Sequence, residues 1–336
     1  MTRGWKQERS RTALAGEFGT IRLLERALAS SGGKGRRRVH VGIGDDAAVI
    51  QAGKGTLVWT VDTCVEGVHF IRAWMGPEDV GWRSFTAAVS DLAAMGARPV
   101  AALANLVVPA DVIDRDLKAV ARGQAQASDA VECPLVGGNV SRGCEFSVTT
   151  TVLGEANSVA LRSGARAGDA LWLCGEVGQA AAGYRLLAAG VGSGRRRASA
   201  PERRCIQAWR RPSALIDAGV RLARVATSLI DISDGLSGDA HHLADAGHVR
   251  IVVEQSRLEH ALSKDLHRAA QALDQSPLDL ALTGGEDYAL LATGPARRRP
   301  REAVCIGRVE AGRGVQLERP DGSRVRLGRG FDHLAE

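Results

Sequence analysis

The first half of the chain alternates short apolar runs with longer segments whose apolar residues recur at helical spacing. Short runs bounded by glycine or proline predict strands, and the longer segments predict helices. Strands are predicted at 56–61, 100–108, 135–138 and 145–155, and helices at 78–95 and 111–130. The apolar run TLVWTV at 56–61 predicts a buried strand. This order of elements predicts an α/β unit that closes near Gly154.

The second half repeats this alternation and predicts a second α/β unit. Strands are predicted at 169–175, 227–232, 249–254, 288–293 and 303–309, and helices at 178–190, 212–224 and 233–247. Pro212 is expected at the first position of its helix, where a missing amide hydrogen costs nothing. A length of 336 residues also favours two domains. We therefore expect domains at 1–155 and 156–336.

Hydropathy and cysteine usage exclude several classes of protein. No apolar run reaches the roughly 18 residues that a membrane span needs. The charged N-terminal segment lacks the apolar core of a signal peptide, so a cytoplasmic location is expected. The six cysteines are scattered without a C-x-x-C pair, which argues against a zinc site or a disulfide framework.

The formal net charge of +6 raises the question of nucleic acid, but the distribution of arginine argues against it. Arginines gather in three stretches rich in small residues, at 32–38, 192–204 and 294–302. We expect these stretches to be solvated loop insertions. A phosphorylated small molecule fits the excess charge as well as nucleic acid does.

Acidic residues stand beside apolar strands or inside apolar helices at several places. They are Asp45, Asp46, Asp62, Asp91, Asp231, Asp234, Glu286 and Asp287. Each alone has an ordinary explanation, such as a helix cap for Asp234 or a turn for Asp287. Asp45 and Asp46 are adjacent, and such like charges repel more strongly when buried. A bound cation would explain this pair, and so would a solvated turn.

Asp91 is the acid that a cap or turn explains least well. At helical spacing its neighbours are Ala87, Ala88, Ala94 and Met95, a face that suits close packing against another backbone. An ionised carboxylate without a partner is costly to bury there. Several such acids in one chain suggest Mg²⁺, which takes oxygen ligands and holds substrate phosphates. The pattern favours a metal–phosphate site and leaves unrelated caps and turns as the alternative.

The usual phosphate and nucleophile motifs are absent from the sequence. There is no G-x-x-x-x-G-K-[ST], and no helical pattern follows GIGDDA at 42–47, so neither a P-loop nor a Rossmann site is indicated. Protein-kinase motifs and G-x-S-x-G are also missing. His69 and Arg162 are each open to a structural interpretation, although an arginine near a phosphate site suits a clamp.

Nine motifs in order give the chain a close resemblance to the thiamine-monophosphate kinase family. They are GEFG (16–19), GIGDDAAV (42–49), VDTCVEGVHF (61–70), SDLAAMGARP (90–99), GGNVSRG (137–143), LRSGARAGD (161–169), IDISDGL (230–236), GGEDY (284–288) and GFDHL (330–334). They extend over nearly the whole chain. Each alone is weak, but their order is highly specific.

The resemblance implies the α/β (α+β) two-domain fold of the aminoimidazole ribonucleotide synthetase superfamily. An N-terminal mixed sheet with helices would bind ATP and Mg²⁺ and form a homodimer, and a C-terminal α/β domain would complete the phosphate and substrate site. It also implies a reaction in which ATP and thiamine monophosphate give ADP and thiamine diphosphate, the last step in the biosynthesis of thiamine diphosphate. Neither a membrane nor nucleic acid is an expected partner.

The resemblance also assigns roles to residues. Metal ligands are expected at Asp46, Thr60, Asp62, Asp91, Asn139, Asp231 and Asp234. ATP contacts are expected at Gly138, Asn139, Arg162 and Ser233, substrate contacts at His69, Glu286 and Phe331, and catalytic roles for Asp46, Asp91, Asp234 and Arg162. Asn139 departs from the family, which often has GGDTTRG where this chain has GGNVSRG. An amide oxygen is a neutral ligand, so weaker metal binding is expected at this position than at an aspartate.

Phosphoryl transfer to a phosphate needs no strong general base, because the acceptor oxygen is already ionised at neutral pH. Holding two anions together is the main barrier, which Mg²⁺ ions and Arg162 would offset. Other readings remain: selenophosphate synthetase or a hydrogenase-maturation protein of the same superfamily, a silent sensor of thiamine phosphates, and an RNA-binding protein using its arginine loops.

Overall fold

The computed structural model describes residues 23–24, 26–28, 36–41, 49–192 and 196–329. Asp45, Asp46 and Phe331, together with the motifs at 16–19 and 330–334, lie outside the described residues. The chain divides into two compact units. The first comprises Met1–Leu92 and Arg98–Glu155, and the second comprises Ala93–Ala97 and Ala156–Glu336.

A mixed four-stranded sheet forms the centre of the first unit. Its strands are β3 (Thr56–Val65), β4 (Arg98–Val108), β5 (Leu135–Arg142) and β6 (Ser147–Ala156), in the spatial order β3-β6-β4-β5. β4 runs parallel to β5 and antiparallel to β6. Two further strands, β1 (Val39–Val41) and β2 (Val49–Ile50), pair separately after the 3₁₀ helix η1 (Arg36–Arg38).

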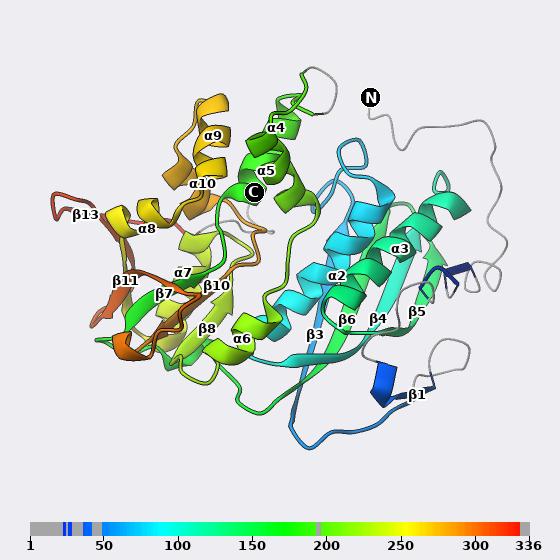
Figure 1. The fold of residues 1–336 in the computed structure, drawn as a ribbon, viewed down its shortest axis with the longest axis horizontal. Helices are drawn as coiled ribbons and strands as arrows, with labels where there is room; N and C mark the ends of the chain where they lie inside the picture. Colours follow the sequence, from blue (N-terminus) through cyan, green and yellow to red (C-terminus); the bar gives the residue numbers. More distant parts are fainter. Residues whose placement is uncertain (1–22, 25, 29–35, 42–48, 193–195, 330–336) are drawn as a thin grey trace. The chain divides into compact units, whose positions relative to one another are not determined.

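Two helices, α2 (Pro77–Ala94) and α3 (Asp114–Ala130), cover one face of this sheet (Figure 1). They cross at unusually close range because each has a glycine at the contact. A Cβ atom at Gly81 would collide with the carbonyl oxygen of Val120, and one at Gly123 would collide with that of Glu78. The close crossing holds α2, which carries Asp91, firmly against α3.

The other face of the sheet is partly open, so the prediction that 56–61 is a buried strand is wrong. Leu57, Trp59 and Val61 are 58%, 74% and 62% exposed, and they alternate with less exposed residues along β3. Side chains of successive strand residues point to opposite faces. The indole of Trp59 donates a hydrogen bond to Thr151 Oγ1 (2.7 Å) on the neighbouring strand. In the part of the chain that the structure describes, helices pack against only one face of this sheet, and an apolar run does not show which face that is.

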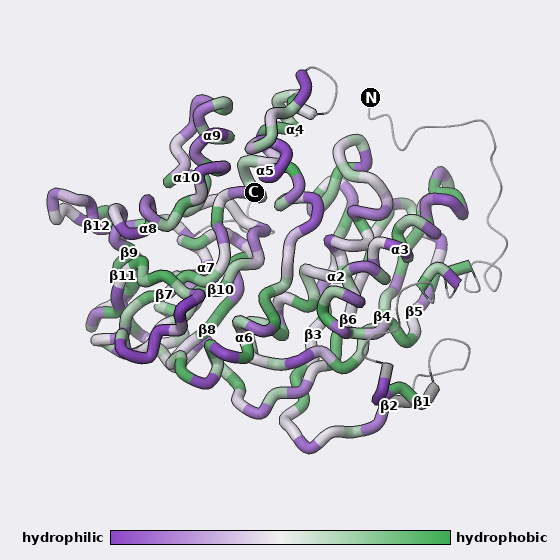
Figure 2. The backbone as a smooth tube through the Cα atoms, viewed as in Figure 1, coloured by the Kyte–Doolittle hydropathy of each residue, from purple (hydrophilic) through white to green (hydrophobic). Residues whose placement is uncertain are grey.

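A seven-stranded sheet in the order β13-β12-β9-β11-β7-β10-β8 forms the centre of the second unit. Its strands are β7 (Ala170–Cys174), β8 (Ser228–Asp231), β9 (Arg250–Glu254), β10 (Leu290–Gly294), β11 (Val304–Glu310), β12 (Gly314–Glu318) and β13 (Arg324–Arg326). Every residue of β7, β8 and β10 is buried, and hydrophobic stretches follow these strands in Figure 2.

The helices of the second unit include several that the sequence pattern did not predict. They are η2 (Arg162–Gly164), α4 (Gln179–Ala188), α5 (Ala200–Arg210), α6 (Ile216–Leu222), α7 (Leu236–Gly247), α8 (Gln255–Ala261), α9 (Lys264–Ala272), α10 (Pro277–Thr283) and η3 (Ala296–Arg298). Pro212 does not begin a helix, because α6 starts four residues later. No helix in the described part of the chain has both the length and the apolar character needed to cross a membrane.

The stretch 192–204 is not simply a solvated loop, because its last part belongs to α5. Ser199 is the N-cap of this helix and forms a capping box with Glu202, which satisfies backbone amides at the helix start. Cys205 and Trp209 then turn into the core, where they are 0% and 2% exposed. Buried residues four apart stabilise the helix despite the arginines around them.

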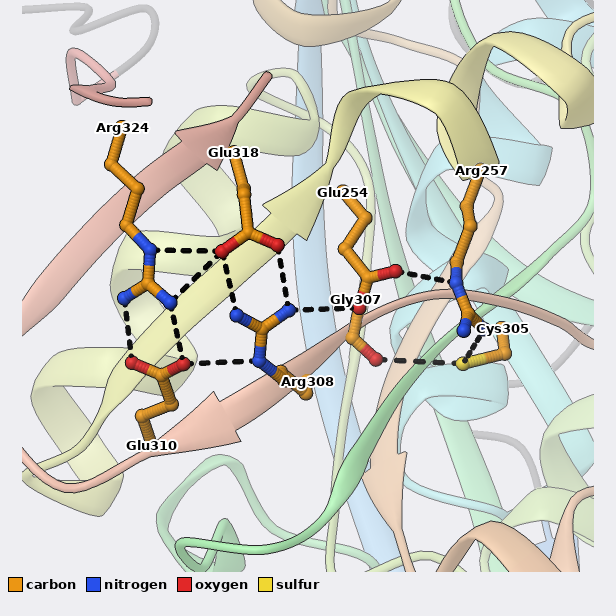
Figure 3. Close-up of polar contacts among 8 residues, drawn as sticks. All are labelled: Glu254, Arg257, Cys305, Gly307, Arg308, Glu310, Glu318 and Arg324. Atoms are coloured by element: carbon orange, nitrogen blue, oxygen red, sulfur yellow. Dashed lines mark hydrogen bonds and ion pairs between the residues drawn. The ribbon is translucent and has the colours of Figure 1, made fainter. Parts of the chain in front are cut away.

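Ion pairs join the strands at one edge of this sheet (Figure 3). Arg308 on β11 donates to Glu254, Glu310 and Glu318, which lie on β9, β11 and β12. Arg324 on β13 donates to Glu310 and Glu318. The paired guanidinium groups hold the pKa of the Glu318 carboxyl down to about 2. These cross-strand pairs fix the register of the edge strands.

Candidate active site

In the first unit, Thr60 on β3 and Asp91 on α2 meet across the interface between sheet and helix. Thr60 Oγ1 donates to Asp91 Oδ2 at 2.5 Å. Both residues are half-buried. The small side chains around Asp91, among them the buried Ala87 and Ala88, let α2 approach the strand closely enough for this contact. Two predicted metal ligands are therefore adjacent.

Asp62 and His69 lie further along the same segment. Asp62 is two residues from Thr60 on β3, so both side chains are directed to the same face of the sheet. Asp62 Oδ1 accepts the amide hydrogen of Thr63 (2.7 Å). His69 Nδ1 accepts the amide hydrogen of Val65 (3.1 Å), so a neutral His69 carries its proton on Nε2.

Asn139 lies on β5, on the opposite face of the sheet from Thr60. Its Nδ2 donates to Asn105 Oδ1 at 3.0 Å, and Asn105 is paired in register with Thr149. Thr149 Oγ1 in turn contacts Thr63 Oγ1 (2.9 Å), whose side chain is directed away from the face of Thr60. The structure therefore does not bring Asn139 beside Thr60 and Asp91.

Gly138 has a structural reason to be glycine. A Cβ atom at this position would collide with the carbonyl oxygen of Ala104 on β4. The parallel pairing of β4 and β5 therefore requires a residue without a side chain here. A contact between Gly138 and ATP stays a prediction.

In the second unit, two motif loops pack directly on each other. The first follows β8, which ends at the buried Asp231, and continues through Ser233 and Asp234 into α7. The second follows α10 and contains Glu286. The amide of Glu286 donates to the carbonyl of Ser233 (2.8 Å), and the amide of Tyr288 donates to that of Ile232 (2.9 Å). Asp231, Ser233, Asp234 and Glu286, all predicted site residues, are thereby brought together.

Asp239 is a residue of this site that the sequence analysis missed. It lies in the first turn of α7 and is 1% exposed, and its Oδ2 accepts the amide hydrogen of Asp234 (3.1 Å). Burial, followed by the charges of Asp234 and Asp231, raises the pKa of Asp239 to about 8. An acid five residues after Asp234 in SDGLSGD was the available signal, but an acid in a first helical turn is ordinary.

These donor atoms fit a hard divalent cation. Oxygens of Asp234 and Asp239 and a ring nitrogen of His242 all lie within 4.8 Å of one another. Asp231 adds a third carboxylate, whose charge acts on Asp239. Carboxylates crowded in this way are stabilised by a cation between them, and oxygen donors suit Mg²⁺. In the first unit the donors at Thr60, Asp62 and Asp91 are all oxygens.

Glu286 and Asp287 are neighbours with different partners. Glu286 Oε2 accepts a hydrogen bond from the buried indole of Trp209 (3.1 Å), a contact that has no signal in the sequence. Asp287 accepts the amide hydrogens of Gly178 (2.6 Å) and Ala180 (3.0 Å) at the start of α4. Burial raises the pKa of Asp287 to about 7 despite these two bonds. Glu286 is thus positioned by Trp209, and Asp287 caps a helix.

The predicted site residues that the structure describes are divided between the two units. Thr60, Asp62, His69, Asp91, Gly138 and Asn139 belong to the first unit, and Arg162, Asp231, Ser233, Asp234 and Glu286 belong to the second. Arg162 is exposed at the start of η2. Asp46 and Phe331 lie outside the described residues, so their roles stay predictions.

Comparison with known proteins shows which family the chain is similar to. Residues 44–156 match the family model described as AIR synthase related protein, N-terminal domain. The chain is 35% identical over 321 residues to thiamine-monophosphate kinase of Aquifex aeolicus, which covers 95% of this chain and 98% of that protein. It is 36% identical over 303 residues to the Mycobacterium tuberculosis protein of the same name, over 88% of this chain and 85% of that one.

Solved structures give the same result for the fold. A structure of AaThiL complexed with AMPPCP and TMP matches with a TM-score of 0.78 at 33% identity, over 95% of this chain and 97% of that one. Thiamine-monophosphate kinase from Stenotrophomonas maltophilia K279a matches with a TM-score of 0.79 at 30% identity, over 94% and 99% of the two chains. The hydrogenase maturation protein HypE shares the fold alone, at 18% identity.

The two α/β units and their carboxylate-bearing loops define an AIR synthase-related protein, which confirms the predicted fold class. Within that class, the identity to the curated relatives extends over nearly the full length of both chains. The chain belongs to the thiamine-monophosphate kinase family, a family of kinases, as its ordered motifs indicated.

Proposed function

We propose that this protein phosphorylates thiamine monophosphate with ATP, giving thiamine diphosphate and ADP by direct in-line transfer. The observation that carries the proposal is the packing of the Asp231–Asp234 loop against the Glu286 loop, because it joins phosphate-site carboxylates to a predicted substrate contact. Full-length identity to proteins of that name supports it. A relative whose structure contains AMPPCP and TMP supports the choice of substrates.

The residues of each unit have separate tasks in this proposal. Asp46, Thr60, Asp62, Asp91, Asn139, Asp231 and Asp234 would hold several Mg²⁺ ions, and Asp239 positions Asp234 through its amide. Bound Mg²⁺ supplies the positive charge that two phosphorylated substrates need in order to approach each other. Gly138, Asn139, Arg162 and Ser233 would contact ATP, and His69, Glu286 and Phe331 would contact thiamine monophosphate. Trp209 holds the Glu286 carboxylate in place.

The direct test is product formation by the purified full-length protein. With thiamine monophosphate, ATP and Mg²⁺, chromatography should show thiamine diphosphate, and a chelator should abolish it. Asp234→Asn should lower turnover roughly 100-fold, since it removes a charge from the phosphate site. Asp274→Asn, at an exposed aspartate on another loop, is the matched control and should leave turnover unchanged. Binding of both substrates without turnover would instead identify a sensor.

We also propose that the protein is a cytoplasmic homodimer that pairs through the open face of the first sheet. Leu57, Trp59 and Val61 give that face an exposed apolar strip, which a monomer seldom leaves uncovered. Trp59→Asp should convert the dimer to a monomer in sedimentation velocity because it places a charge in the strip. A dimer unchanged by this substitution would exclude the face as the interface.

A further inference from the structure

The second unit contains a cavity of about 450 Å³, and none of the residues that line it is assigned to the site above. Its lining includes Arg196, Arg197, Arg203, Ile206, Gln207 and Arg210. Pockets for small molecules usually have volumes of about 300–1,000 Å³, so this one is large enough for a ligand. We call it the arginine cavity. Four of its lining side chains carry guanidinium groups.

One wall of the arginine cavity is a single face of α5. Arg203, Ile206, Gln207 and Arg210 follow the spacing i, i+3, i+4 and i+7, which aligns them along one side of a helix. The core face of the same helix carries Cys205 and Trp209, so the helix cannot rotate to bring the arginines elsewhere. The positive side chains of this wall are thus fixed in direction by the packing of the other face.

The segment before α5 also lines the cavity, and Glu202 orders this segment. Arg196 donates to both carboxylate oxygens of Glu202 (3.0 and 2.5 Å), and the amide of Ser199 donates to Oε2 (2.7 Å). Backbone bonds between Arg196 and the residues Gly190 and Gly192 close this segment on itself. The guanidinium of Arg196 holds the pKa of Glu202 down to about 2, so this support persists at any ordinary pH.

The charges of the cavity are only partly neutralised. Arg196 is paired with Glu202, but Arg197 and Arg203 have no ion pair with any carboxylate in the part of the chain that the structure describes. Like charges around a cavity repel one another, and a bound anion removes that cost. Guanidinium groups bind phosphate through two parallel hydrogen bonds, which makes them the preferred side chains for this ligand.

We propose that the arginine cavity binds a small molecule carrying two or more linked phosphate groups. Arg203 and Arg210 are seven residues apart, which separates their Cα atoms by about 10 Å along the helix. An elongated anion can contact arginines at both ends, whereas a single phosphate reaches only one end. This proposal does not rest on the kinase reaction, because none of the lining residues belongs to the site proposed for it.

The test is calorimetric titration of the full-length protein with inorganic pyrophosphate in EDTA, which prevents divalent-ion-dependent binding at the carboxylates. We expect one site per chain, and binding of orthophosphate about tenfold weaker or less. Arg197→Gln with Arg203→Gln should weaken pyrophosphate binding by about tenfold or more. Arg297→Gln with Arg298→Gln, which removes the same charge from η3, is the matched control and should bind like the unmodified protein.

Three results would overturn the proposal: no pyrophosphate binding, equal weakening by both double variants, or tighter binding of a single-stranded oligonucleotide that both double variants weaken equally. The last two would indicate a nonspecific charge effect. Circular dichroism checks that each variant folds. If the double variant does not fold, Arg197→Gln alone replaces it in the titration, because Arg197 is exposed. Turnover without pyrophosphate should be the same in Arg197→Gln as in the unmodified protein, which separates this cavity from the catalytic site.

Discussion

Replacing Asp287 by asparagine should change how the stability of the protein depends on pH. Asp287 is half-buried in the loop before β10, where it contacts the start of α4, and desolvation raises its pKa from 3.8 to about 7. Between these pH values the folded protein keeps a proton that the unfolded chain has lost. The unfolding free energy therefore falls as pH rises through this range. Asparagine resembles the protonated acid in shape and charge, so Asp287→Asn should remove this dependence.

The size of the effect follows from the two pKa values. A difference of one between the two pKa values corresponds to about 1.4 kcal/mol of unfolding free energy. The contribution of Asp287 to the unfolding free energy therefore falls by about 2 to 3 kcal/mol between pH 5 and pH 8. Asp287→Asn should therefore gain about that much stability relative to the unmodified protein as pH rises from about 5 to about 8.

The assay is urea unfolding followed by tryptophan fluorescence at several pH values, with EDTA present throughout. Asp239, whose pKa is also raised, remains in both proteins and cancels in the comparison. Asp274→Asn, at an exposed aspartate, should keep the pH dependence of the unmodified protein. A stability difference between Asp287→Asn and the unmodified protein that stays constant with pH would refute the reasoning, because the burial cost of the charge would then be absent.

Two further substitutions test the substrate and metal assignments. Trp209→Phe keeps a buried aromatic ring but removes the hydrogen-bond donor to Glu286. It should raise KM for thiamine monophosphate about threefold to tenfold and leave KM for ATP unchanged. Equal changes in both KM values would mean that Trp209 supports only the fold. Asn139→Asp should lower the Mg²⁺ concentration for half-maximal rate at saturating ATP, because a charged oxygen binds Mg²⁺ more tightly than an amide. An unchanged midpoint in that titration would show that position 139 does not contact the metal.

Most strands and several helices could be predicted from the sequence because their signals are local. The predicted strand at 100–108 and helix at 78–95 agree within two residues with β4 and α2. α5 was missed because arginines conceal its pattern, and its buried residues become recognisable only once the opposing core is known. The exposure of Trp59 was missed for a related reason, since an apolar run does not reveal which faces of a sheet are covered.

The candidate site also contains both residues that the sequence predicted and a residue that it did not. Asp231, Asp234 and Glu286 were found because they stand in motifs whose order along the chain is distinctive. Asp239 lies three residues after the IDISDGL motif and was missed, because the sequence does not show that its carboxylate turns back to the amide of Asp234.

The sequence by itself determined the family, the order of most strands and the kind of donor atoms available, because all three are properties of residue identity and spacing. Only the tertiary structure decided which donors meet. The Trp209–Glu286 bond joins residues 77 positions apart, and the bond from Asp287 to the amide of Gly178 spans 109 positions. Such pairs have no local signal, since they form only when packing of the two elements excludes water and leaves each polar group one available partner.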